Sequence, residues 1–156
     1  MKSNTQLSDV LHVLLHMAEH DGPVTSEMLA SAMQTHPVAL RRLMAGLRHA
    51  GFVGSEKGHG GGWVLACPLD RITLLDVHDA LGAPGFVSLG FREDRPECLV
   101  AQAVNEALGA AVAAAEALLL ERLGSVTLAA LSKDFHQRMA IHGRAPHRLE
   151  EHRHEH

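Results

Sequence analysis

Cysteine and aromatic residues are both scarce in this chain of 156 residues. Its two cysteines, Cys67 and Cys98, are too few for the dense disulfide framework that holds small secreted domains together. One tryptophan, four phenylalanines and no tyrosine are present. A hydrophobic core therefore has to be built mainly from leucine, valine, alanine and methionine.

A leader sequence and a long unbroken apolar run are also missing. The residues from Met1 to Gln6 lack the apolar stretch and the small-residue cleavage site of a signal peptide. The longest strongly apolar stretch, residues 107–120, is interrupted by Gly109 and Glu116 and falls short of the roughly 20 residues that a membrane span needs. We therefore expect a cytoplasmic protein with no membrane association.

An overall excess of basic charge is absent too, because the formal net charge is −4 at pH 7. The acidic excess is local: residues 67–131 contain nine acidic and four basic side chains. Residues 35–63 instead contain four basic side chains and one acidic side chain, together with three histidines. Charges act over about 8–10 Å at physiological salt, so this basic segment can bind phosphates although the whole chain is acidic.

The overall composition of the chain is ordinary for a globular protein, with 46% hydrophobic and 21% charged residues. Apolar residues recur at helical spacing in several segments, each bounded by capping residues or by glycine and proline. Thr25 or Ser26 is the expected N-cap of the second helix, and Thr35 or His36 that of the third. Thr73 is the expected N-cap of the fourth. The expected helices cover residues 7–20, 26–33, 37–50, 74–81, 96–123 and 126–131.

Two short strands are expected between the third and fourth helices, over residues 52–57 and 63–67. The connecting segment, residues 58–62, has four glycines in five residues, and glycine adopts the positive φ values that a hairpin connection needs. Three helices followed by a glycine-tipped hairpin is the order of a winged helix-turn-helix. We therefore expect a mainly α fold with a small β-hairpin wing and a long dimerisation helix.

The expected organisation has four parts. A winged helix-turn-helix DNA-binding domain covers residues 1–84, and a connecting sensor-region segment covers residues 85–95. A dimerisation helix and a short terminal helix cover residues 96–131, and a polar, histidine-rich tail covers residues 132–156.

DNA recognition is expected from the third helix and the hairpin. In this fold the third helix enters the major groove and reads base edges from its N-terminal half, where arginine can bind guanine through two hydrogen bonds. Glycines at the tip let the backbone approach a phosphate or the minor groove, and the start of the second helix can hold a phosphate. A solvated helix face and a simple tight turn are the alternative interpretation of the same residues. The candidate DNA-binding residues are Thr25, Ser26, Thr35, His36, Pro37, Val38, Arg41, Arg42, Lys57, His59, Gly60 and Gly61.

Several stretches also resemble the Rrf2 family of bacterial transcription factors, from the start of the chain to about residue 131. The most specific are residues 58–65 (GHGGGWVL), with Trp63 after the wing glycines, and residues 72–81 (ITLLDVHDAL). The resemblance implies a dimeric repressor, less often an activator, that senses redox state, iron–sulfur status, nitric oxide or a small molecule. The other matching stretches are residues 11–18 (LHVLLHMA), 23–29 (PVTSEML), 40–53 (LRRLMAGLRHAGFV) and 125–131 (SVTLAAL).

The resemblance also raises the question of a sensor. Iron–sulfur members of the family have three cysteines before or at the start of the long helix, whereas this chain has only Cys98 there. A cluster generally needs three or four protein ligands, so we expect no iron–sulfur cofactor. Ligation by histidine or carboxylate, and a site shared between subunits, stay open.

Cys98 is instead a candidate single-thiol redox sensor. A position near the N-terminus of a helix favours the thiolate, and oxidation to a sulfenic acid or an intersubunit disulfide could shift the two wings. The alternative is a buried apolar thiol, as expected for Cys67. Residues 86–91 could line a small-molecule pocket or pack on the wing domain.

Histidine is unusually common, with thirteen residues. Five of them lie between residues 142 and 156, toward the end of the tail, which could bind metal ions weakly or simply be solvated. His12 and His16 share a helix face and could also bind a metal ion, but no third ligand is evident beside them in the sequence, so packing is the default interpretation.

The apolar stripe of the long helix predicts a homodimer through residues 96–123, because a monomer would leave a large apolar patch exposed. A two-fold dimer then predicts a palindromic operator in double-stranded DNA. No catalytic triad, phosphate loop or metalloprotease motif is present, so we expect no enzyme. The remaining alternatives are a regulator that responds to a small molecule or a metal, and a protein-interaction module on the same fold.

Overall fold

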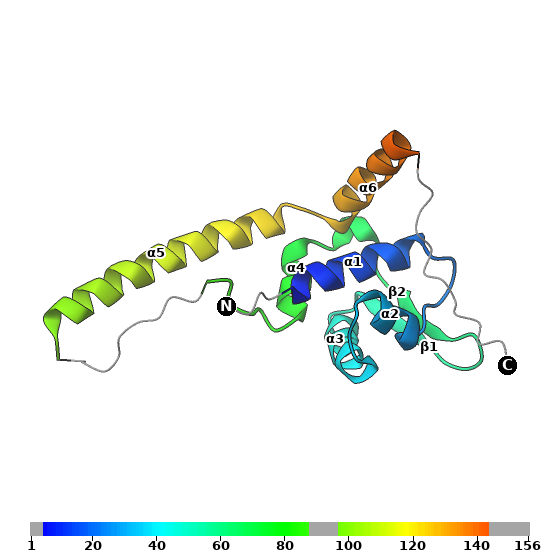
Figure 1. Cartoon of the computed structure of the whole chain (residues 1–156), viewed down its shortest axis with the longest axis horizontal. Helices are drawn as coiled ribbons and strands as arrows, with labels where there is room; N and C mark the ends of the chain where they lie inside the picture. The colour runs from blue at the N-terminus through cyan, green and yellow to red at the C-terminus, as the bar shows by residue number, and fades with distance from the viewer. Residues whose placement is uncertain (1–4, 88–96, 144–156) are drawn as a thin grey trace.

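A computed structural model describes residues 5–87 and 97–143 of the chain (Figure 1). Most of the predicted connecting segment and the end of the predicted tail lie outside these residues. The helices and strands are α1 (Gln6–Glu19), α2 (Ser26–Ala32), α3 (Pro37–His49), β1 (Val53–Glu56), β2 (Gly62–Leu65), the short 3-10 helix η1 (Leu69–Arg71), α4 (Leu74–Ala80), α5 (Leu99–Gly124) and α6 (Leu128–His142).

Side-chain caps fix where α2, α3, α4 and α6 begin. The Thr25 hydroxyl accepts a hydrogen bond from the Met28 amide at 3.2 Å and starts α2. Thr73 starts α4 through a capping box with Asp76, in which each side chain accepts a hydrogen bond from the other residue's amide. The cap of α3 is His36, one of the two residues predicted for it. The predicted mainly α fold with a two-stranded hairpin is confirmed.

The hairpin formed by β1 and β2 is the wing. Its strands pair antiparallel, with Val53 opposite Leu65 and Glu56 opposite Gly62. Both strands are shorter than predicted. Phe52 lies outside β1 because its amide closes α3 by donating to the Leu47 carbonyl at 3.0 Å. The wing is therefore directly continuous with the end of α3.

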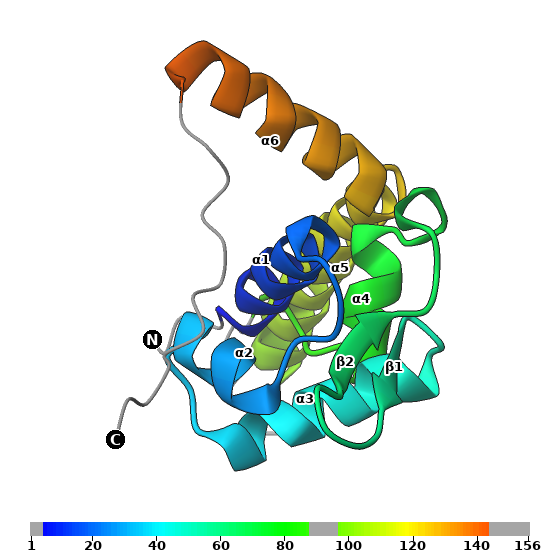
Figure 2. The same ribbon diagram turned by 90° about the vertical axis from the view of Figure 1, so that its right-hand side faces the viewer.

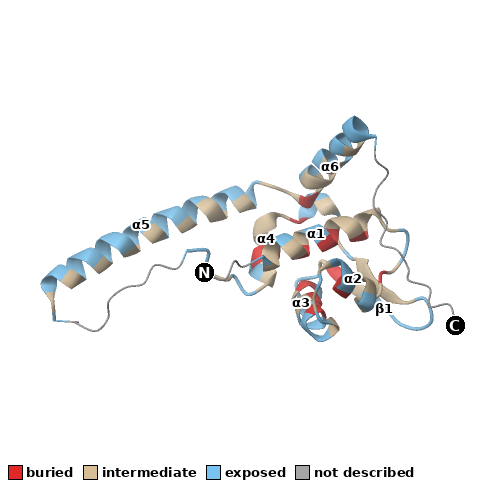
Figure 3. Ribbon diagram, in the orientation of Figure 1, coloured by how far each residue is buried: buried red, intermediate tan, exposed pale blue. Residues whose placement is uncertain are grey.

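The hydrophobic core lies where α1, α2, α3, α4, β1 and the start of α6 meet. Leucine, valine and methionine dominate it, as the low aromatic content predicts, and the buried faces of these helices are red in Figure 3. The least exposed large side chains are those of Leu14, Leu29, Leu40, Met44, Leu47, Ile72 and Leu128.

Leu128 ties the C-terminal part of the chain to this domain. Its amide donates to the Ile72 carbonyl at 2.8 Å, and the Leu74 amide donates to the Val126 carbonyl at 3.0 Å. The segments before α4 and α6 thus pair with each other. The chain returns to the domain along α5, which begins at its far end, and α6 then contacts α1 (Figure 1).

The long helix α5 projects from the winged domain and is exposed along its length (Figures 1 and 3). None of its residues is buried, and Leu99 and Val100 are more than two-thirds exposed, at 77% and 73%. With 26 residues and a mean hydropathy of 1.5 in its most apolar window, it is long and apolar enough to cross a membrane by length and composition alone. The expectation that the apolar run is too short was wrong, because the helix continues on both sides of residues 107–120.

The last helix also differs from the prediction. A short helix was expected at residues 126–131 or a little beyond, followed by a polar tail from residue 132, but α6 continues to His142. Leu128 is the only buried residue on α6, whereas Leu131, Phe135 and Met139 continue its apolar side at helical spacing and are half-buried. Gly143 ends the helix at a φ of 61°, a left-handed conformation that glycine adopts readily.

Candidate nucleic-acid interface

The exposed face of α3 presents three arginines to solvent. Leu40, Met44 and Leu47 are buried, and this side of the helix fixes α3 in the core. The residues on the opposite side follow helical spacing, so they form one continuous surface. We call this surface the α3 face; it consists of Val38, Ala39, Arg41, Arg42, Ala45, Arg48 and His49.

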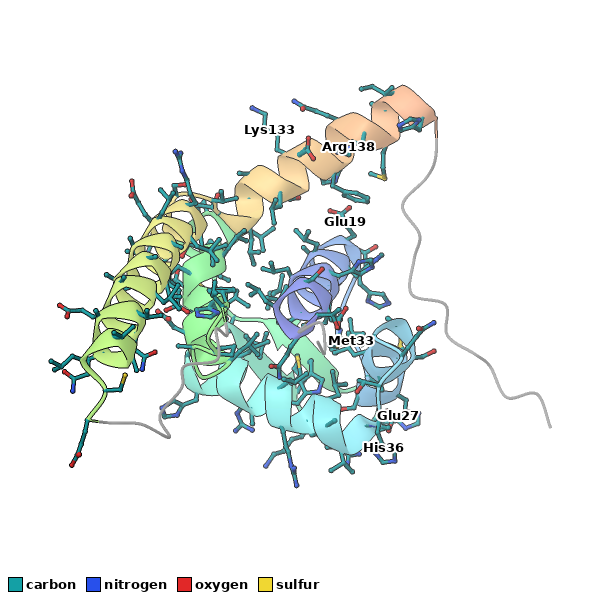
Figure 4. All side chains as sticks on the ribbon, turned by 60° about the vertical axis from the view of Figure 1, so that its left-hand side comes forward. Glu19, Glu27, Met33, His36, Lys133 and Arg138 are labelled. Atoms are coloured by element: carbon teal, nitrogen blue, oxygen red, sulfur yellow. The ribbon has the colours of Figure 1, made fainter. Side chains whose placement is uncertain are left out.

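The N-terminal end of the α3 face is shaped by His36. Its Nδ1 accepts a hydrogen bond from the Val38 amide at 3.3 Å, so the neutral ring carries its proton on Nε2. The exposed ring therefore offers an N–H donor to solvent next to the first turn of α3 (Figure 4). Val38 is 49% exposed, whereas Thr35 and Pro37 are half-buried.

Between α2 and α3 the chain makes a tight turn. Gln34 has a φ of 49°, in the left-handed region, and the Thr35 amide donates to the Ala30 carbonyl at 2.9 Å. The two helices then pack on each other as a helix-turn-helix unit. Thr35 thus serves this turn through its backbone.

The start of α2 is joined to the wing through Trp63. The indole Nε1 of Trp63 donates to the Ser26 hydroxyl at 3.0 Å, and the backbones of Val24 and Trp63 exchange hydrogen bonds at 2.9 and 2.7 Å. A Cβ at Gly62 would lie 2.5 Å from the Val24 carbonyl oxygen, so only glycine fits at this crossing. Because Ser26 accepts from Trp63, its own hydroxyl proton is still available to a ligand.

The wing tip depends on glycine conformations. Gly58 and Gly60 have φ values of 99° and 77°, and the Gly61 amide donates to the Gly58 carbonyl at 3.1 Å. A Cβ on Gly61 would collide with the Glu56 carbonyl. The tip is compact as a result, and it exposes Lys57 and His59.

The α3 face and the wing lie along one edge of the domain, away from α6 (Figure 2). The exposed cations of this edge are Arg41, Arg42, Arg48 and Lys57, while Glu27 and Glu56 are its exposed carboxylates. The fold thus brings the predicted helix and hairpin residues to the same edge, which fits the polyanionic backbone of DNA.

Two features of this edge were not among the predicted site residues. Arg48 completes the α3 face, and its spacing of seven residues from Arg41 was the signal that could have identified it. The Trp63–Ser26 hydrogen bond joins residues 37 positions apart in sequence, and no local pattern reports such a contact.

The two cysteines lie outside the α3 face and outside both strands of the wing. Cys98 is the half-buried N-cap residue of α5, without a side-chain capping hydrogen bond, and Cys67 is a half-buried residue after β2. Both are free thiols. Among the residues that the structure describes, no group of three or more His, Cys, Asp or Glu side chains is arranged to hold a metal ion. One thiol does not meet the ligand requirement of an iron–sulfur cluster, so these residues do not fit that cofactor within one chain.

A buried histidine lies beneath the start of the connecting segment. His78 on α4 is 2% exposed, and its ring stacks on Phe86 with centroids 4.4 Å apart. Within residues 5–87 and 97–143 its Nδ1 has no hydrogen-bond partner. Phe86, predicted to line a pocket or to pack, therefore packs on α4.

Comparisons with known proteins agree with this architecture. Residues 3–134 match the Rrf2 family, described as an iron-dependent transcriptional regulator. YwnA of Bacillus subtilis, described as an HTH-type transcriptional regulator, is 26% identical over 125 residues, which cover 80% of this chain and 92% of that protein.

Two solved structures extend the similarity to three dimensions. The T. potens IscR structure has a TM-score of 0.60 and 27% identity, and the match covers 88% of this chain and 90% of that one. The structure of CymR, the global cysteine regulator of B. subtilis, has a TM-score of 0.56 and 25% identity, with coverage of 85% and 96%. The chain belongs to the Rrf2 family of winged helix-turn-helix transcriptional regulators.

Proposed function

We propose that this protein is a cytoplasmic, sequence-specific DNA-binding repressor that binds a palindromic operator as a homodimer. The observation that carries the proposal is the α3 face, which presents Arg41, Arg42 and Arg48 on the same edge as the wing. Arg41 and Arg42 near the start of α3 read guanine edges, and Val38 contacts a thymine methyl group. A protein that occupies an operator overlapping a promoter in this way keeps RNA polymerase from binding there.

The other candidate residues contact the DNA backbone or hold the contacting residues in position. His36 donates through Nε2, and the Ser26 hydroxyl donates to a phosphate beside the start of α2. At the wing, Lys57 and His59 bind phosphate or enter the minor groove, where Gly60 and Gly61 allow a close backbone approach. Thr25, Thr35 and Pro37 hold these donors in position. Arg48, farther along α3, neutralises a flanking phosphate.

The apolar side chains of α5 are proposed to pack against a second copy of the chain. The exposed apolar residues of this helix include Leu99, Val100, Val104 and Leu118. A bilayer would also have to accept the carboxylates of Glu106 and Glu116 on the same helix, at about 2.5–3.5 kcal/mol for each charged residue near its centre. A pair of α5 helices lets those carboxylates stay in water, so we favour the dimer.

Dimer symmetry determines what the operator should look like. A two-fold axis through paired α5 helices gives two α3 faces, and in this class of proteins they bind half-sites about 34 Å, or one turn of DNA, apart. The test is to select binding sequences from a random DNA pool with the full-length protein. We expect an inverted repeat whose half-sites lie about 10 base pairs apart, and affinity that falls steeply with salt.

Selection that enriches no sequence would contradict the proposal. The protein-interaction alternative would then be favoured, because it uses the same fold and the apolar α5 without base contacts. A direct repeat, or a single half-site, would contradict the symmetric dimer while keeping DNA binding.

Redox sensing through Cys98 is the second part of the proposal. Its free thiol belongs to the N-cap residue of the helix that also carries the proposed dimer contact, so oxidation to a sulfenic acid, or to a disulfide with the partner subunit, changes the relative position of the two wings. Peroxide should weaken operator binding by the wild-type protein but not by Cys98→Ser, with Cys67→Ser as the matched control. Equal responses of the wild-type protein and Cys98→Ser would favour a small-molecule or metal signal instead.

A further inference from the structure

Two histidines on the outer side of α1 point at each other. His12 and His16 are one helical turn apart, and their Nε2 atoms are 2.8 Å apart. The ring centroids are separated by 4.5 Å, with an angle of 36° between the planes. In this contact the Nε2 of one ring donates a hydrogen bond and the Nε2 of the other ring accepts it. Two imidazole nitrogens therefore already converge on one point.

The spacing of the two nitrogens is close to that of a metal chelate. Zinc–nitrogen bonds of about 2.0–2.1 Å at a tetrahedral angle place two ligating nitrogens about 3.3 Å apart. The 2.8 Å separation has to open by only about half an ångström, which side-chain rotation can supply. The metal ion replaces the shared proton, which moves to the Nδ1 of the same ring, so both rings bind as neutral ligands.

A carboxylate lies one turn farther along the same side of α1. Glu19 is three residues after His16 and points between α1 and α6 (Figure 4). Its Oε2 is 3.1 Å from the Nε2 of His136, and the Nδ1 of His136 is 2.7 Å from the Ser132 carbonyl oxygen. The contact with His136 holds one carboxylate oxygen and leaves Oε1 for another partner. A metal-binding carboxylate is usually oriented by such a hydrogen bond.

These groups surround a cavity between α1 and α6. It has a volume of about 130 Å³ and is lined by His12, Leu15, His16, Glu19 and Phe135. Leu15 and Phe135 form apolar walls, which limit the water that competes for a bound ion. The cavity is large enough for one metal ion with its remaining water ligand.

We propose that His12, His16 and Glu19 form a binding site for one divalent transition-metal ion, with water as the fourth ligand and His136 as the residue that positions Glu19. Imidazole nitrogen with one carboxylate oxygen suits zinc and the neighbouring late first-row metals. In the described residues the three donors do not yet surround one point, so binding requires Oε1 of Glu19 to turn toward the histidine pair while Oε2 keeps its contact with His136. The site is on α1, away from the α3 face, and does not depend on the proposed function.

The test is calorimetric titration of the full-length, metal-free protein with Zn²⁺. Histidines of the C-terminal tail can also bind zinc, so the variants have to separate the two sources. His12→Ala and His16→Ala each remove a ligand and should weaken the tightest site by more than about a hundredfold, beyond the usual effect of losing an outer-shell partner. Glu19→Gln also removes a charged ligand and should weaken it by a similar factor, whereas His136→Ala removes only the residue that positions Glu19 and should weaken it roughly tenfold. His152→Ala/His154→Ala removes two tail histidines as a matched control and should leave the tightest site unchanged.

A second measurement guards against indirect effects of the substitutions. X-ray absorption at the zinc edge of the wild-type protein with one equivalent of Zn²⁺ should report two imidazole ligands and additional oxygen ligands. The proposal is overturned if His12→Ala and His16→Ala bind zinc as the wild-type protein does, if the tail variant loses the tightest site, or if the spectrum indicates fewer than two imidazoles.

Discussion

Three glycines set how closely the elements of the DNA-binding domain approach one another. A Cβ at Gly46 would lie 2.5 Å from the Ala80 carbonyl oxygen, and one at Gly62 would lie equally close to the Val24 carbonyl oxygen. A Cβ at Gly61 would collide with the Glu56 carbonyl. In each case the obstacle is backbone, which cannot rotate away as a side chain can. The positions of α3 and of the wing therefore depend on the absence of single methyl groups.

Gly46→Ala tests this at the junction of α3 and α4. Alanine favours a helix over glycine by up to about 1 kcal/mol, so propensity alone predicts a more stable protein. The contact with Ala80 predicts the opposite, a loss of about 1–3 kcal/mol from overpacking. Urea unfolding followed by circular dichroism measures the free energy of unfolding. A variant as stable as the wild-type protein would contradict the close packing of α3 on α4.

Some features of single residues could be predicted from the sequence, and others could not. The N-caps at Thr25, His36 and Thr73 were predictable because a capping side chain acts within three residues of its own position. The need for glycine at position 46 was not, because its neighbour Ala80 is distant in the sequence. The candidate His12–His16 pair was visible as a spacing, but Glu19 was not associated with it and His136 reaches the cluster only through the fold.

At the scale of elements, the wing and the helix-turn-helix act as one unit. The pairing of Val24 with Trp63 adds a short backbone crossing to the hairpin, and the Trp63 side chain binds the first residue of α2. The Phe52 amide closes α3 at the other end of the hairpin. A wing attached at both ends holds its tip at a fixed distance from α3, which the proposed contact with DNA needs.

A double-mutant cycle measures the attachment of the wing to α2. Trp63→Phe removes the indole N–H, and Ser26→Ala removes its acceptor. We expect a coupling energy of about 0.5–1.5 kcal/mol between the two changes, the usual net contribution of one hydrogen bond. Stability should be followed by circular dichroism, because Trp63 is the only tryptophan. Strictly additive effects would mean that the hydrogen bond does not hold the wing.

Elements that bury one side in the core were the easiest to predict. Helices α1 to α4 lie close to their predicted bounds for this reason. In the later turns of α6, Leu131, Phe135 and Met139 follow helical spacing but are only half-buried. Polar contacts such as the ion pair between Arg138 and Asp134 at 2.7 Å also support the helix. That hydrogen bond and the charge of Asp134 raise the pKa of Arg138. Such exposed pairs stabilise a helix without leaving a hydrophobic period in the sequence.

At the scale of the whole molecule, the winged domain and α5 have opposite surfaces. The domain has its own core and a charged recognition edge, whereas α5 exposes apolar side chains over its whole length. The pairing of the segments before α4 and α6 connects the two parts. A dimer formed through α5 would therefore fix the relative position of two recognition edges.

Charges placed on α5 should separate the subunits. Val104 and Leu118 are 50% and 56% exposed and lie on the same side of the helix. We expect Val104→Lys/Leu118→Lys to convert a dimer into a folded monomer, because two cations would face their copies across the interface. Sedimentation equilibrium measures the mass. Ile141→Lys makes the same kind of change at an exposed position of α6 and should stay dimeric; persistence of the dimer in the α5 variant would place the interface elsewhere.

DNA reading by the α3 face should be visible in the operator affinity of an arginine variant. Fluorescence anisotropy with a selected operator fragment should give at least about thirtyfold weaker binding for Arg41→Ala/Arg42→Ala, since each lost arginine–guanine contact costs about 1–3 kcal/mol. The control Arg71→Ala/Arg122→Ala removes the same charge from exposed positions on η1 and α5 and should bind within a few-fold of the wild-type protein. Equal affinity of both variants, or a larger loss in the control, would contradict the account.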